Sequence, residues 1–291
     1  MDCVMENDKL VSVHFDSIID YMNTPPTKTN KDLYNSLKRR SSGRWFGPTS
    51  NGDYDETIRL GLVGDQKLMS SLENKISELQ ENLRVTDSKI KINEVFRKRT
   101  RGAQGDELDI HAVYQGRLDI AWSRTERIVQ DSETKLVTLL IDNEDNSGVS
   151  AEDSIWRSAC AVLLCRQLEA AGKSVRIITY GASEFAFKND PRAQTVSITI
   201  KEYNTSLALS RLAAMSHIGF GRAAGFTAQC LTNIKTSPHL GRSVRFDKNL
   251  IPIHFHNQIN SGFTKVLYVG KANNIYKARE TLAQLTQELV S

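Results

Sequence analysis

One stretch of the chain, residues 135–181, constrains the fold more strongly than any other. It contains an apolar run, an acidic loop, an apolar helical run and a second apolar run, at residues 135–141, 142–150, 151–171 and 174–180. Two apolar strands joined by a helix of this length predict a parallel βαβ unit, with Gly172 at the end of the helix. The acidic loop then lies at the carboxyl end of the first strand, the edge where ligands bind in open α/β sheets.

The helix of this unit is apolar on every side. Residues 158–165 read Ser-Ala-Cys-Ala-Val-Leu-Leu-Cys, and a helix without a polar face belongs in a protein interior. Both strands are nearly continuous apolar runs, which is typical of a parallel sheet covered on two faces. We therefore predict an α/β domain, a mainly parallel sheet covered by helices, over residues 105–291. A helical, basic N-terminal region is expected over residues 1–104.

Composition excludes several classes of protein. Hydrophobic residues make up 40% of the chain and charged residues 25%, which allows a packed core. No apolar run approaches the ~18 residues that cross a bilayer, so we expect no membrane partner. The first eight residues are acidic and do not resemble a signal peptide. The four cysteines form no Cys-x-x-Cys pair, which indicates free thiols in a reducing compartment.

A long helix is predicted over residues 65–96, with Asp65 as its cap. Its apolar residues follow steps of four, four, three and four and form a short heptad seam, Leu68, Leu72, Ile76, Leu79 and Leu83. This seam can pack on its own domain or on a second subunit, so self-association stays open.

Weaker patterns predict the remaining elements. Residues 11–22 place apolar residues at helical spacing, and residues 273–289 form an amphipathic helix. Residues 195–200 alternate between apolar and polar, which predicts a half-exposed strand that is antiparallel or at an edge. Two further strands are expected near residues 250–255 and 265–269.

Basic residues gather in two clusters. The first contains Lys38, Arg39, Arg40 and Arg44, followed at once by Trp45. The second lies in residues 84–101, where seven basic residues face two acidic ones, and it includes Arg97, Lys98, Arg99 and Arg101. Cationic groups bind phosphates and aromatic faces stack on bases, so this combination is typical of single-stranded nucleic-acid binding. A net charge of only +4 does not oppose this, because such binding needs charge clusters. A solvated basic surface is the alternative.

The acidic loop at residues 142–150 resembles the metal loop of the von Willebrand factor A-type fold. In that family an Asp-x-Ser-x-Ser motif supplies hard oxygen ligands. The matching positions here are Asp142, Glu144 and Asn146, so only the aspartate is retained. We expect no bound metal, and a solvated loop that caps the following helix explains the acidic residues equally well.

No catalytic motif is present. Gly219, Gly221 and Gly225 follow a helix and lack the full phosphate-loop pattern, so they indicate a flexible connection or tight packing. His254 and His256 would share one face of a strand, but no further ligands lie at zinc spacing. Because no nucleophile and base can be paired, we predict a protein that is not an enzyme and has no cofactor.

The order of several segments resembles an uncharacterised family of tailed-bacteriophage proteins. The segments are Trp45–Ser50, Tyr54–Ile58, Gly105–Gly116 with Trp122, and Ser147–Asp153 with the apolar helix. A fainter similarity, in size and basic clusters, points to the single-stranded DNA-binding cofactor of the RNA polymerase in N4-like phages. This resemblance implies a phage RNA polymerase as partner and the host cytoplasm as location.

Together these patterns favour a single-stranded DNA-binding protein that acts in phage transcription or replication. The predicted contacts are the nine basic and aromatic residues of the two clusters. The alternative is a protein-interaction module of A-domain type, in which the loop at residues 142–150 holds a divalent ion or a protein partner.

Overall fold

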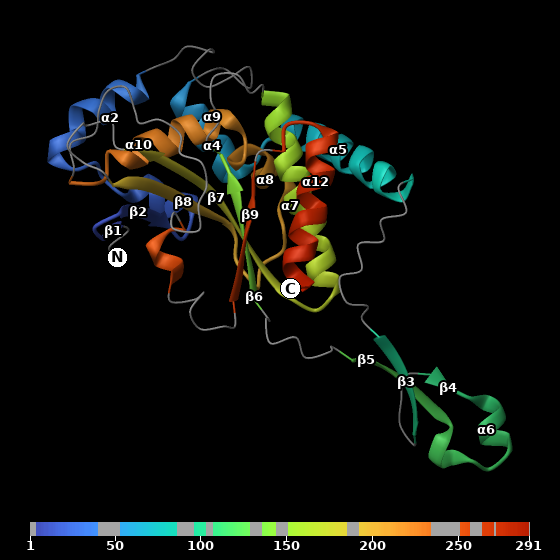
Figure 1. The fold of residues 1–291 in the computed structure, drawn as a ribbon. Helices are drawn as coiled ribbons and strands as arrows, with labels where there is room; N and C mark the ends of the chain where they lie inside the picture. Colours follow the sequence, from blue (N-terminus) through green and yellow to red (C-terminus); the bar gives the residue numbers. More distant parts are fainter. Residues whose placement is uncertain are drawn as a thin grey trace.

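Two β-sheets organise the protein in this computed structural model (Figure 1). The structure describes residues 4–39, 53–85, 96–102, 107–128, 136–143, 151–184, 192–233, 251–256, 264–270 and 272–290. A six-stranded sheet with helices packed against it contains nearly all of the buried apolar residues, and a three-stranded sheet with one short helix forms a second unit.

The six-stranded sheet has the order β1-β2-β8-β7-β6-β9. Its strands are β1 (Val4–Glu6), β2 (Leu10–Phe15), β6 (Leu136–Asp142), β7 (Ser174–Glu184), β8 (Ala193–Lys201) and β9 (Thr264–Val269). Three neighbouring pairs are parallel, β2 with β8, β6 with β7 and β6 with β9. The pairs β1 with β2 and β7 with β8 are antiparallel. The predicted α/β fold with a mainly parallel sheet covered by helices is thus confirmed.

The βαβ unit is present as predicted. Its helix α7 (Ala151–Ala170) connects β6 to β7, and Gly172 follows it with a φ of 82°. The Lys173 backbone N–H donates to the carbonyl of Leu168 at 3.0 Å, the hydrogen bond that commonly closes a helix end. Most of α7 is buried because the sheet lies on one side and α5 (Gln66–Val85) and α12 (Ile275–Val290) pack on others.

Helix α5 packs its seam on its own domain. Leu68, Leu72, Ile76 and Leu79 are buried in one cluster with residues of α7. The Asp65 carboxylate caps the helix by accepting hydrogen bonds from the backbone N–H groups of residues 67 and 68 at 2.9 and 3.0 Å. The seam therefore belongs to the core, and the alternative of a subunit contact at this seam is wrong.

The N-terminal region does not form a separate helical unit. β2 pairs with β8 along its whole length, from Leu10 beside Ala193 to Phe15 beside Ile198. The helical spacing predicted for residues 11–22 is wrong before Ser17, whose side chain caps α1 (Ile18–Asn23). The structure also departs from the predicted boundary after residue 104, because strands from both sides of this boundary pair with each other in each sheet.

Strand β8 lies antiparallel to β7, as one of the two alternatives predicted. Its expected exposure is wrong, because Thr195, Ser197 and Thr199 are all buried. These hydroxyls form hydrogen bonds within the sheet: the Thr195 hydroxyl donates to that of Ser12 at 2.9 Å, and Thr199 accepts from Arg176 at 3.1 Å. Polar residues with partners can be buried, so their alternation did not mark a solvent face.

Residues 251–255 do not form the predicted strand, and residue 250 lies outside the described residues. The structure has a 3-10 turn there, η5 (Ile253–Phe255), which begins after Pro252. The turn packs on the sheet face that carries Ser12, where the Ile253 N–H donates to the Ser12 hydroxyl at 3.0 Å and Phe255 is buried against Leu140 and Ile178.

The other helical elements of the described chain pack around the larger sheet. They are η1 (Lys28–Asn30), α2 (Lys31–Lys38), α4 (Tyr54–Val63), α8 (Leu209–Met215), α9 (Ile218–Phe220), the π-helical turn η3 (Gly221–Gly225) and α10 (Phe226–Gln229). The glycine segment predicted at residues 219–225 is therefore helical. None of the helices in the described ranges is long and apolar enough to span a membrane.

The smaller sheet has the order β3-β5-β4. Its elements are β3 (Phe96–Gly102), β4 (Glu107–Leu108), α6 (Ile110–Tyr114), the 3-10 turn η2 (Leu118–Ile120) and β5 (Trp122–Ile128). The helix predicted over residues 65–96 thus ends earlier, and the basic run that follows it is a strand.

Candidate functional site

The register of β3 and β5 sorts the basic residues of the small sheet by face. Arg97 lies opposite Arg127, Arg99 opposite Thr125 and Arg101 opposite Ser123. Residues opposite each other in an antiparallel pair share a face, and residues two apart in a strand share it as well. Four arginines, Arg97, Arg99, Arg101 and Arg127, are therefore on one face of a two-stranded ribbon, which we call the arginine face.

The opposite face of the ribbon has mixed charge. There Lys98 lies opposite Glu126 and Thr100 opposite Arg124. The structure therefore separates Lys98 from the three arginines with which it was predicted to act. Arg127 was missed in the sequence, because residues 122–128 are apolar only at their two ends, Trp122 and Ile128, and so lack the alternation that marks a strand.

Arg101 marks the end of the arginine face nearest α6. Its guanidinium is 3.3 Å from the carboxylate of Asp109, and its side chain is 58% exposed. An exposed pair of this kind contributes little stability, because water screens both charges. Arg101 can therefore exchange this carboxylate for another anion at small cost.

The first basic cluster belongs to the larger unit. The Lys38 ammonium lies 4.9 Å from the ring centroid of Tyr54 and 3.5 Å from the Asp55 carboxylate, so it stabilises the packing of α2 on α4. Arg39 is exposed after the end of α2. Arg40, Arg44 and Trp45 lie outside the described residues. Within the described ranges, the structure does not join this cluster to the arginine face.

The acidic loop begins at a buried carboxylate. The side chain of Asp142 is 7% exposed, accepts a hydrogen bond from the Tyr268 hydroxyl at 2.5 Å and lies 4.0 Å from the Arg157 guanidinium. Arg157 also donates to the Asp142 carbonyl, and its own side chain is 1% exposed. Asp142 thus has structural partners, and residues 144–150 lie outside the described residues. The described residues contain no group of three side chains placed to hold a metal ion.

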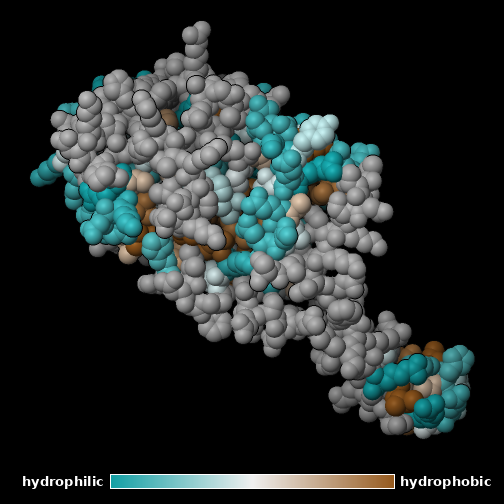
Figure 2. Space-filling model, in the orientation of Figure 1, coloured by the Kyte–Doolittle hydropathy of each residue, from teal (hydrophilic) through white to brown (hydrophobic). Residues whose placement is uncertain are grey.

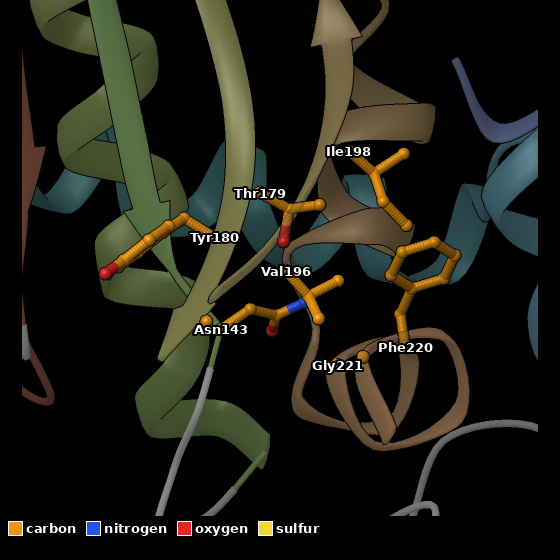
Figure 3. A pocket seen from close by; sticks show the side chains of 9 residues that line it. Asn143, Thr179, Tyr180, Val196, Ile198, Phe220 and Gly221 are labelled. Atoms are coloured by element: carbon orange, nitrogen blue, oxygen red, sulfur yellow. The ribbon is translucent and has the colours of Figure 1, made fainter. Parts of the chain in front are cut away.

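A cavity lies at the carboxyl ends of β6 and β7, beside η3 (Figure 3). It has about 280 Å³ of atom-free space, including its open mouth. The residues that line it are Asn143, Thr179, Tyr180, Gly181, Val196, Ile198, Phe220, Gly221 and Gly225. This is the sheet edge at which strand direction predicts ligand binding.

Asn143 is one of the polar residues that line this cavity. Its Nδ2 donates to the carbonyl of Met215 at 2.8 Å, whereas Oδ1 is buried and has no hydrogen-bond partner among the described residues. Such an acceptor is commonly satisfied by an ordered water. Gly221 lies so close that an added Cβ would be 2.4 Å from the Asn143 carbonyl oxygen. The tight packing predicted for this glycine segment is therefore found at Gly221, and a water molecule suffices to explain the cavity.

Two histidines, His14 of β2 and His254 of η5, lie against each other where η5 packs on the larger sheet. The His14 ring is 5.3 Å from that of His254, its Nδ1 is hydrogen-bonded to Ser197 at 2.9 Å, and its Nε2 is 3.4 Å from an Arg176 nitrogen. Burial, the Arg176 charge and His254 together lower the pKa of His14 to about 3. Because His254 is in a turn, it does not share a strand face with His256 as predicted.

Comparison with known proteins identifies a family. The family described as a domain of unknown function, DUF7192, matches residues 3–281, a range that includes both sheets. The search of curated proteins and the search of solved structures returned no match.

Proposed function

We propose that this chain, which belongs to the DUF7192 family, binds single-stranded DNA through the arginine face and catalyses no reaction. The observation that carries the proposal is the register of β3 and β5, which places four arginines on one face of the two strands. The acidic residues beside this face lie at one end of it, where Glu107 of β4 is opposite Ser123 and Asp109 is 3.3 Å from Arg101. Arginine guanidinium groups match the geometry of phosphate oxygens and bind them by paired hydrogen bonds.

The arrangement suits a nucleic-acid backbone better than a small anion. Arg97, Arg99 and Arg101 form a row along β3, and Arg127 of β5 lies beside the first of them, so the positive charge extends along the strand. A linear row of cations can follow successive phosphates, and this contact is independent of base sequence. In keeping with the resemblance to phage proteins, we place this binding in phage transcription or replication in the host cytoplasm, with a phage RNA polymerase as the partner.

Salt dependence provides the test. Binding of labelled single-stranded DNA, duplex DNA and single-stranded RNA is measured by fluorescence anisotropy over a range of salt concentrations. Each phosphate neutralised on a single strand contributes about 0.7 to the slope of log affinity against log salt. A triple variant, Arg97→Ala with Arg99→Ala and Arg127→Ala, should therefore reduce the slope by about 2.

The opposite face of the same ribbon supplies the matched control. Lys98→Ala with Arg124→Ala removes two positive charges from the same strands, but from the other face. We expect this variant to retain most of the slope and affinity. Equal losses in both variants would show that overall charge, and not the arginine face, causes binding. An absence of binding at low salt would refute the function itself.

A second candidate function has support in the topology. The order β8-β7-β6-β9, with β8 antiparallel to β7 and the acidic loop after β6, is consistent with the A-domain resemblance. Because Asp142 already contacts Tyr268 and Arg157, we propose that such a module would bind a protein through this edge without a metal ion. A rise in melting temperature with Mg²⁺ or Ca²⁺ that disappears in Asp142→Ala would contradict the metal-free form.

A further inference from the structure

The small unit, residues 96–102 and 107–128, exposes an unusual set of large apolar side chains. Ten such side chains are exposed among the described residues, and five of them lie between residues 108 and 118. They are Leu108 at 46%, Ile110 at 59%, Val113 at 36%, Tyr114 at 86% and Leu118 at 63%. Figure 2 shows brown surface on this unit at lower right. A concentrated apolar surface of this kind marks an interaction site.

Helix α6 shows that this exposure is not incidental. Ile110, Val113 and Tyr114 have the spacing i, i+3, i+4, which places them on one side of the helix. This is the spacing of a side that packs against a core. In α6, however, the buried residue is the small Ala112, at 5%, and the large residues are exposed. The helix thus presents its apolar side outward. Leu108, just before α6, and Leu118, in η2, add two further exposed apolar side chains.

The size of the small unit indicates that it needs a partner. Units of fewer than ~40 residues seldom bury enough apolar surface to be stable without disulfides, metals or association. The residues of this unit with described burial include only three buried ones, Ala112, Ala121 and Ser123. Covering the apolar side of α6 would supply the missing burial.

We propose that this apolar side binds the same side of a second copy of the chain. Charge supports this occupant, since an acidic residue precedes the apolar side of α6 and an exposed basic residue, Arg117, follows it. The acidic residue is Asp109, which caps α6 and exchanges its exposed pairing with Arg101 at small cost. When the apolar sides of two α6 helices pack antiparallel about a twofold axis, Arg117 of each copy approaches Asp109 of the other. The arginines of β3 and β5 mostly occupy the other end of the unit. Two copies can therefore meet at α6 while most of their strongest positive charges stay apart.

The contact does not require nucleic acid, so it can be tested separately from the proposed function. Sedimentation velocity of the full chain without DNA, from about 1 to about 200 µM, measures the monomer–dimer equilibrium. We expect a reversible dimer in this range. Variants Val113→Glu with Tyr114→Glu should weaken it at least tenfold, since two buried charges would face each other across the axis. Arg117→Glu should weaken it as well.

Tyr276 provides the matched control. It is 72% exposed on α12, against 86% for Tyr114, so Tyr276→Glu places a glutamate at a similarly exposed aromatic position of the larger unit and matches the single variant Tyr114→Glu. This variant should dimerise like the unaltered protein. A protein that stays monomeric throughout the range would overturn the proposal, as would equal effects of the Tyr114 and Tyr276 substitutions.

Cross-linking gives a second readout if the glutamate variant fails to fold. Cys160, Cys165 and Cys230 are buried and free, so they contribute little background. The fourth cysteine, Cys3, lies outside the described residues and is replaced by serine in every variant of this test. Tyr114→Cys should form a disulfide between two copies under mild oxidation, whereas Tyr276→Cys should not. Failure of Tyr114→Cys to cross-link in a dimer of correct mass would move the contact away from α6 and refute the proposal.

Discussion

Acidification should destabilise this protein through His14. The imidazole side chain is 8% exposed, and its pKa falls from 6.5 to about 3 because burial, Arg176 and His254 disfavour the charged form. The Asp16 carboxylate, 3.5 Å from Nε2, would favour that form, but it is 44% exposed and therefore largely solvated. His14 is thus neutral in the folded protein over a pH range in which the unfolded chain binds a proton.

The sign of the effect follows from this difference in proton binding. The folded-state pKa lies below the unfolded value, so the contribution of His14 to the free energy of unfolding is fully present above the unfolded pKa of 6.5. It is lost as pH falls from 6.5 towards 3, where the unfolded state alone takes up a proton. Between about pH 7.5 and about pH 5 the loss is on the order of 2 kcal/mol. His217, whose pKa is lowered to about 4, should add a loss of similar size.

Urea unfolding at the two pH values measures this loss, and His14→Asn isolates the part due to His14. The variant should be less stable at about pH 7.5 but should lose about 2 kcal/mol less on acidification. His111→Asn, on the exposed surface of α6, serves as the control and should follow the unaltered protein. If His14→Asn and the unaltered protein lose the same free energy of unfolding between the two pH values, the reasoning is refuted.

Two further predictions concern the sheet edge. Gly221→Ala should cost about 1–3 kcal/mol, because the new Cβ would meet the Asn143 carbonyl at 2.4 Å, whereas Gly225→Ala has no atom within 4 Å and should be neutral or stabilise by up to about 1 kcal/mol; urea midpoints that shift alike would contradict this. Arg157→Met should cost about 3–5 kcal/mol because it removes the cation beside the buried Asp142, and Asp142→Asn in the same chain should recover part of the loss, as a double-mutant cycle would reveal.

The βαβ unit could be predicted from the sequence because its signals are local and agree. Two apolar runs, a helix without a polar face and Gly172 all point to one arrangement, and the structure has it. The heptad seam of α5 is also visible in a short stretch of sequence, but the helix that covers it, α7, lies far away in the chain. Spacing alone shows that one side of a helix is apolar, and it cannot distinguish α7 from a second chain as the surface that covers it.

The elements that were missed depend on distant partners. Strand β2 resembles a helix in spacing because Phe15 and Ile18 belong to different elements that happen to lie three residues apart. The sequence of β8 predicts solvent-facing polar residues, because their hydrogen-bond partners, Ser12 and Arg176, belong to other strands. The arginine face is partly predictable from the sequence, because charge alone singles out Arg97, Arg99 and Arg101. Its geometry required knowledge that β5 pairs with β3.

The order in which the strands are made has a consequence for synthesis. Ser12 of β2 and its partner Thr195 of β8 are 183 residues apart. At about 5–20 residues per second, roughly 10–40 s pass between the emergence of the two strands from the ribosome. During that time β2 has only β1 beside it, and a two-stranded hairpin is marginally stable. Phe96 and Ile128 pair over a much shorter stretch, so all strands of the small sheet have been made while four of the six strands of the larger sheet are still missing.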